Sequence, residues 1–210
     1  MPMRIRSIFP AFFLAFFGTP GFALSELPDV GDPPSFEIPL PDPLRSTPGR
    51  TAEETPPAIL YDISTLPEPV ARMRERIMDA CKAGDIEALR QFLSTGARAT
   101  QLSLAGMDGD PIDFLRTLSG DDEGHEILAI LYEVLAAGFV HLDAGTPEEL
   151  YVWPYFVAIP IAGLTPPQRV ELFKLVTAGD YEEMKTYGTY VFFRVGISPD
   201  GEWEFFIGGE

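Results

Sequence analysis

The stretch "ACKAGDIEALRQFLSTGA", residues 80–97, has the pattern of two helices separated by a sharp break. Gly84 can take the left-handed conformation that ends a helix, and Asp85 is well placed to cap the next one. Apolar residues then recur at helical spacing, at Ile86, Leu89, Phe92 and Leu93. Gly96 is a second helix stop. The stretch therefore predicts a helical hairpin with a very tight turn.

The first helix of this hairpin extends upstream to Pro67-Glu68-Pro69, where we expect it to begin. Its apolar residues fall on one face at helical spacing, at Val70, Met73, Ile77 and Cys81. Cys81 is the only cysteine, so no intrachain disulfide can form, and its position on the apolar face predicts a small core residue. We expect the folded part of the chain to begin near Ile59.

The helical hairpin resembles the helical part of an ankyrin repeat. The positions that carry the resemblance are Ala80, Gly84, Asp85, Leu93, Gly96 and Ala97. A weaker second copy spans "DPIDFL" (110–115) and "GHEILAILYEVLAAGF" (124–139), and "LFKLVTAGD" (172–180) is a third echo. The copies depart from the family in spacing, since Gly96 and Gly138 are 42 residues apart against a period of about 33. The resemblance implies divergent hairpins that the rest of the domain must cap.

The C-terminal segment "TYVFFRVGISPDGEWEFFIGG" predicts a β-hairpin around a Ser198–Gly201 turn. We therefore expect an α+β fold, mostly α, in which ankyrin-like helical hairpins precede a C-terminal antiparallel β-hairpin. The block from "YVWPYF" onward is also similar to tails of secreted, uncharacterised proteins of alphaproteobacteria. That resemblance implies a location in the cell envelope and carries no activity.

The N-terminal segment of the chain, residues 1–58, predicts export. Residues 1–23 combine Arg4 and Arg6, a short apolar run and small residues at the end, which is typical of a signal peptide. Residues 24–58 are rich in proline and sparse in apolar residues, which predicts a disordered linker. We expect residues 59–210 to form a single domain, periplasmic or secreted, without stable insertion in a membrane after the signal is removed.

The charge of the chain limits the classes of partner. The formal net charge is −17, and loss of Arg4 and Arg6 with the signal peptide would leave 13 of the 15 basic residues against 32 acidic ones. A polyanion repels phosphate backbones and anionic lipids, so nucleic acid is excluded as an expected partner. The balance favours another protein as the partner, possibly a basic one.

An aromatic segment, "ELYVWPYFVAIP" (149–160), offers the candidate binding residues Tyr151, Trp153, Tyr155 and Phe156. Pro154 argues against a regular central strand there. The rings either present a surface to a peptide or a sugar, or pack into the core of the domain. Packing into the core is the more ordinary outcome for several aromatic rings in a small domain.

The sequence offers no catalytic or metal-binding motif. Its two histidines, His125 and His141, lack the spacing of a metal site, and the acidic stretches at Asp108–Asp110 and Asp121–Glu123 lack the pattern of a calcium loop. We expect no cofactor, no metal and no enzyme activity. The predicted function is an exported protein-interaction module; the alternative is an envelope carbohydrate- or peptide-binding protein or hydrolase that uses residues 151–156 and nearby carboxylates.

Overall fold

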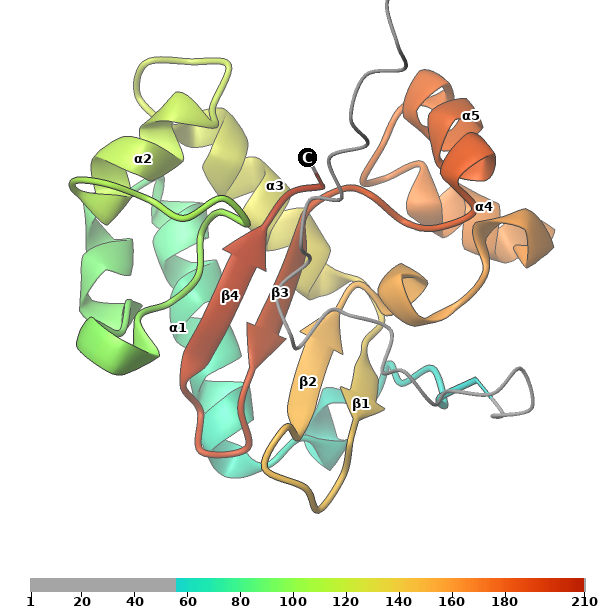
Figure 1. The fold of residues 1–210 in the computed structure, drawn as a ribbon, viewed down its shortest axis with the longest axis horizontal. Coiled ribbons are helices and arrows are strands. Elements are labelled where there is room, and N and C mark those ends of the chain that lie inside the picture. The colour runs from blue at the N-terminus through green and yellow to red at the C-terminus, as the bar shows by residue number, and fades with distance from the viewer. Residues whose placement is uncertain (1–55, 210) are drawn as a thin grey trace, which may run out of the picture. The chain divides into compact units, whose positions relative to one another are not determined.

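The computed structural model describes residues 56–209, so the predicted signal peptide (1–23) and nearly all of the predicted linker (24–58) lie outside the described residues. The described chain is α+β, with α-helices and a four-stranded antiparallel sheet (Figure 1). The α-helices are α1 (Glu68–Ala83), α2 (Pro111–Thr117), α3 (His125–Ala136), α4 (Pro166–Leu172) and α5 (Ala178–Tyr187). The strands are β1 (Val140–Leu142), β2 (Leu150–Trp153), β3 (Arg194–Ile197) and β4 (Trp203–Ile207). Short 3-10 helices are η1 (Ile63–Thr65), η2 (Glu87–Phe92), η3 (Gly96–Arg98), η4 (Tyr155–Ala158) and η5 (Ile161–Gly163).

Helix α1 confirms the first half of the predicted hairpin. Gly84 ends it in the left-handed conformation, with φ 67°, where a side chain would be strained. Val70 and Ile77 are fully buried, and Cys81 packs against the same cluster. Burial raises the pKa of the Cys81 thiol to about 12, so this cysteine is a core residue rather than a reactive thiolate.

The second half of the hairpin differs from the prediction of a helix over 85–96. Asp85 does cap the turn, because its side chain accepts a hydrogen bond from the Ala88 amide at 3.1 Å. The helix that follows is the 3-10 helix η2, which ends at Phe92. Leu93 then forms a parallel bridge with Trp203, and Gln101 another with Phe205. The chain leaves the helix early because this segment runs along β4 and covers its edge, as edges of sheets require.

The sheet is larger than the predicted hairpin, and its strands alternate with helices instead of following them. The strand order is β1-β2-β3-β4, and all neighbours are antiparallel. The expectation that Pro154 argues against a regular central strand was wrong, since β2 lies between β1 and β3 and ends at Trp153. Proline lacks an amide donor and therefore terminates the strand without preventing it. The predicted Ser198–Gly201 turn is confirmed, with the Gly201 amide 2.8 Å from the Ser198 carbonyl oxygen.

Both faces of the sheet are buried. One face, which carries Trp153, Val195 and Trp203, packs in a cluster with residues of α1 and α3, and Figure 1 shows these helices behind the sheet. The opposite face carries Val152 and Phe205, which join a second cluster with residues of α4 and α5. Strands buried on both faces lack the alternation of apolar and polar residues that marks a half-exposed strand. This explains why the sequence pattern did not reveal β1 and β2.

The third sequence echo has a different structure from the first copy. In "AGD" at 83–85 the glycine ends a helix, whereas Ala178 in "AGD" at 178–180 begins α5. Thr177 caps α5, and the Asp180 carboxylate accepts a hydrogen bond from the Thr177 amide at 2.7 Å, so the two residues form a capping box. The same tripeptide, Ala-Gly-Asp, therefore lies at the end of α1 and at the beginning of α5.

None of the helices in residues 56–209 combines the length and the apolar character needed to span a bilayer.

Candidate functional site: an acidic groove at one end of the sheet

The four aromatic residues proposed from the sequence lie in the core. Trp153, Tyr155 and Phe156 have 0% of their surface exposed, and Tyr151 has 6%. The Tyr155 hydroxyl donates to Glu171 at 3.0 Å, and its ring lies 4.2 Å from that of Phe156. Because the sheet is covered on both faces, a ligand could reach these rings only if the fold opened. The structure matches the alternative in which the rings pack into the core.

A groove of about 610 Å³ lies instead at the end of the sheet that carries the β1–β2 loop and the β3–β4 turn. Figure 1 shows this loop and this turn at the same end of the sheet. It is formed by three segments that are distant in the sequence: 98–101, 146–150 and 198–205. Its charged residues are Glu148, Glu149, Asp200, Glu202, Glu204 and one arginine, Arg98. Its apolar lining comes from Ala99, Pro147, Leu150, Pro199 and Phe205. We call this feature the acidic groove.

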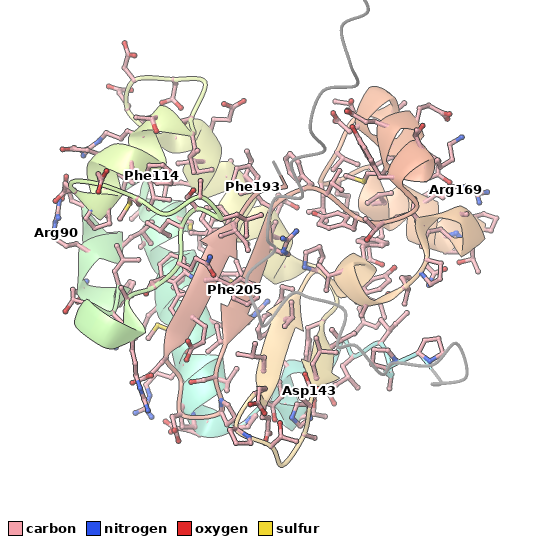
Figure 2. The ribbon with its side chains drawn as sticks, viewed as in Figure 1. Arg90, Phe114, Asp143, Arg169, Phe193 and Phe205 are labelled. Atoms are coloured by element: carbon pink, nitrogen blue, oxygen red, sulfur yellow. The ribbon has the colours of Figure 1, made fainter. Side chains whose placement is uncertain are left out.

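The β1–β2 loop is held in shape by its own hydrogen bonds. The Thr146 amide donates to the Asp143 carbonyl oxygen at 3.1 Å, and the Thr146 hydroxyl to the same oxygen at 2.8 Å. Asp143 has a φ of 51°, a left-handed conformation that is uncommon for a residue with a side chain. Figure 2 labels Asp143 in this loop. The loop thus presents Glu148 and Glu149 to the groove from a constrained backbone.

Glu149 is the anchored carboxylate of the groove. One oxygen accepts from the Gly145 amide at 2.8 Å, and the other lies 2.7 Å from His141 Nε2. The Gly145 amide first, and then His141, hold the pKa of Glu149 below its ordinary value. His141 is itself stacked on Tyr151, with ring centroids 4.3 Å apart. The charge of Glu149 is therefore fixed in position by the sheet beneath it.

The other wall of the groove holds two carboxylates close to each other in sequence on the β3–β4 side. Glu202 accepts from Arg98 at 3.1 Å, from Nη1 to Oε2. Glu204 has a raised pKa, first because it is partly buried and then because of the nearby charge of Glu202, while Arg98 acts in the opposite direction. A carboxylate that is destabilised by burial and by a like charge is poised to gain from an added cation.

No three carboxylates of the groove come within 4.8 Å of one another in the described fold. Within residues 56–209, the only group of three potential ligands within 4.8 Å is Asp121, Glu123 and His125, outside the groove. In that group Asp121 already caps α3, because it accepts from the amides of Glu126 and His125 at 2.8 and 3.0 Å. These amides lower the pKa of Asp121 well below its ordinary value. His125 is the first residue of α3.

Sequence reasoning missed the groove because no local pattern marks it. Its residues come from three separate segments, and acidic residues are common throughout this chain. The one available signal was the combination of Glu148 and Glu149 with the turn at Ser198–Gly201, since loops at one end of a sheet can meet. Comparisons with protein-family models, curated proteins and solved structures found no match to this chain.

Proposed function

We propose that the chain is a non-enzymatic interaction module of the cell envelope whose acidic groove binds a basic segment of a protein partner. The single observation that carries the proposal is the composition of the groove, in which five carboxylates face one guanidinium. Such an imbalance attracts lysine and arginine side chains and repels anions.

The spread of the carboxylates favours a polycation over a metal ion. A divalent ion needs several oxygen ligands around one point, whereas a basic peptide brings several charges on separate side chains. The apolar lining, which includes Leu150 and Phe205, can take the methylene stems of such side chains while their charged ends reach the carboxylates. The groove therefore suits a flexible, lysine- or arginine-containing segment.

The context of the groove supports an exported adaptor. The N-terminal sequence predicts a signal peptide and a proline-rich tether, and residues 80–97 resemble an ankyrin repeat, a family whose hairpins offer surfaces to protein partners. The alternative, an envelope carbohydrate- or peptide-binding protein or hydrolase, rested on residues 151–156 together with nearby carboxylates, and the burial of the rings removes the aromatic part of that support.

The test is titration of the exported chain with a short basic peptide and with an acidic peptide of equal length. We expect micromolar to millimolar binding of the basic peptide alone, weakening steeply between low and high salt. The double variant Glu148→Gln/Glu202→Gln should bind about tenfold more weakly, because two groove charges are lost.

The matched control is Glu182→Gln/Glu183→Gln, which removes two exposed charges from α5. It alters the net charge equally but leaves the groove intact. If this control weakens binding as much as the groove variant, attraction to the whole acidic chain explains the result and the groove is not the site.

A further inference from the structure

His141 on β1 is paired with the groove carboxylate that the β1–β2 loop anchors. Its Nε2 atom lies 2.7 Å from Glu149 Oε1. The imidazole stacks on Tyr151, with 11° between the ring planes, and this stacking fixes its orientation against the carboxylate. The side chains of His141 and Glu149 are 29% and 21% exposed, so the pair is shielded from water more than the other ion pairs of the groove wall and still open to protons.

The carboxylate determines which ring nitrogen of His141 carries the proton. The Gly145 amide, and then His141, hold the pKa of Glu149 below its ordinary value, so Glu149 is ionised at neutral pH. An ionised carboxylate only accepts hydrogen bonds. Nε2 is therefore the nitrogen that donates to Glu149, and a second proton must add to Nδ1.

A proton on Nδ1 changes the charge at this wall of the groove by one unit. While the imidazole is neutral, the His141–Glu149 pair carries the negative charge of the carboxylate. The imidazolium cancels that charge, and the hydrogen bond from the Gly145 amide keeps the carboxylate in place. Residues 143–149 contain no lysine or arginine, so the β1–β2 loop itself offers no other group that could neutralise Glu149.

The ionisable groups that face His141 come from β2 and from its own loop. From β2 they are Glu149, its ion-pair partner, and Tyr151, whose pKa is raised above its ordinary value by burial and then by the charge of Glu149. Its own strand continues to Asp143, an exposed aspartate. Carboxylic acids ordinarily titrate near pH 4, whereas histidine is the side chain that ordinarily changes charge between pH 5 and 8.

The elements before β1 in the chain carry carboxylates that have partners of their own. Asp62 caps η1, because its side chain accepts from the Ser64 amide at 2.9 Å. Glu68, in the first turn of α1, pairs with Arg72 at 2.5 Å. A change in charge near pH 6 on this side of the groove can therefore be assigned to the His141–Glu149 pair.

We propose that His141 is a pH sensor of the acidic groove: the neutral imidazole leaves the charge of Glu149 available to a basic side chain, and the imidazolium neutralises it. This regulation rests on the proposed function of the groove. It makes binding of a basic segment strongest at neutral or slightly alkaline pH and weaker in mildly acidic surroundings.

The first experiment uses the unmodified exported chain without any ligand. The chain has two histidines, and His125→Gln identifies which imidazole signal in the NMR spectrum belongs to His141. Between pH 8 and 5, the backbone amide signal of Gly145, which donates to Glu149 at 2.8 Å, should move with the same midpoint as the His141 imidazole. A Gly145 amide signal that does not follow His141 would overturn the proposal.

The second experiment measures binding of an acetylated peptide that contains lysine and arginine as its only ionisable residues. Its Kd is compared at pH 7.5 and 5.5 in a Glu204→Gln background, because Glu204 has a raised pKa and could lose its own charge in this range. We expect the Kd to rise about two- to threefold at pH 5.5, the effect of one charge some 8 Å away in water. Addition of His141→Gln, which keeps an amide donor for Glu149 but cannot be protonated, should abolish the rise.

The other histidine provides the matched control. His125 is half-exposed at the start of α3, outside the groove, so His125→Gln in the same background should leave the twofold to threefold rise intact. If the rise persists in His141→Gln, or disappears in His125→Gln as well, His141 is not the sensor. If the peptide fails to bind at either pH, the proposed function of the groove is wrong and its regulation falls with it, whereas binding that ignores pH refutes the sensor alone.

Discussion

Arg98 Nη1 lies 3.1 Å from Glu202 Oε2 in the acidic groove, so the chain places one of its own guanidinium groups where we expect a partner's basic side chain to bind. Arg98 is 77% exposed, and an exposed ion pair of this kind contributes only about 0–1 kcal/mol. It is therefore weak enough to be displaced.

Replacement of Arg98 should strengthen binding of a basic peptide. In Arg98→Gln the carboxylate of Glu202 is free, and the repulsion between Arg98 and the incoming cation is lost, so we expect about a two- to fivefold lower Kd at low salt. Calorimetric titration measures it. Arg72→Gln, which breaks the exposed Arg72–Glu68 pair on α1, is the matched control and should leave the Kd within twofold. Weaker binding by Arg98→Gln would mean that Arg98 itself holds the ligand.

Gly201 in the β3–β4 turn should tolerate no side chain. Its φ is 82°, and a Cβ atom there would lie 2.7 Å from the Pro69 carbonyl oxygen at the start of α1. Gly201→Ala therefore combines backbone strain with a steric clash, and we expect the free energy of unfolding to fall by about 2–4 kcal/mol. Urea denaturation gives the value.

Gly145 in the β1–β2 loop provides the control for that substitution. Its φ is 78°, but nothing lies within 4 Å of an added Cβ atom. Gly145→Ala should therefore cost only the backbone strain, about 1 kcal/mol. If the two variants lose the same free energy of unfolding, the contact between the added Cβ atom and Pro69 does not destabilise Gly201→Ala.

Helix α1 and the Ser198–Gly201 turn could be predicted from the sequence because their signals are local. Helical spacing of apolar residues and a glycine stop define α1, and the Ser198-Pro199-Asp200-Gly201 stretch defines the turn. The shortening of the second helix could not be predicted in this way. It depends on Leu93 bridging to Trp203, a contact between residues more than a hundred positions apart in the sequence.

The acidic groove and the burial of the aromatic rings both depend on the sheet. Without knowledge that β2 lies between β1 and β3, Tyr151 and Trp153 could equally belong to a surface loop. Likewise, Glu149 and Glu204 become neighbours in one groove only when the β1–β2 loop and the β3–β4 turn are brought to the same end of the sheet. Such contacts are set by tertiary structure and leave no periodic pattern.

Trp153 should be a determinant of stability. It is fully buried on β2, with its ring 5.1 Å from that of Phe139. Trp153→Ala leaves a large cavity, and we expect a loss of about 3–5 kcal/mol in the free energy of unfolding. Tyr187→Ala, at an aromatic residue that is 64% exposed, should change it by less than about 0.5 kcal/mol. A stable, folded Trp153→Ala chain that has lost ligand binding would instead make the ring part of a binding site.

The native Glu204 should lower the stability of the folded chain and strengthen its binding of a basic peptide. Burial and the charge of Glu202 raise its pKa in the folded chain, so the folded state disfavours the ionised form that predominates at pH 7. Glu204→Gln removes that unfavourable charge, and we expect the variant to be more stable than the parent at pH 7 by up to about 1 kcal/mol. At the same pH it should bind a basic peptide more weakly, because the groove has lost a carboxylate.

The pH dependence of the Glu204 variant gives the sharper test. A group whose pKa is raised on folding favours the folded state most below its ordinary pKa, and this contribution is lost as the pH rises through the folded-state pKa. The stability advantage of Glu204→Gln should therefore shrink as the pH is lowered from 7 to 4, where the parent glutamate is also becoming neutral. Urea denaturation at several pH values measures the difference in the free energy of unfolding between Glu204→Gln and the parent.

A stability advantage of Glu204→Gln that stays constant over this range would show that the ionisation of Glu204 is not its cause. A variant that is less stable than the parent at pH 7 would contradict the prediction outright. Glu204→Gln should thus raise stability and weaken binding. This combination is expected of a binding-site residue whose charge lowers the stability of the free protein and is kept because it attracts the ligand.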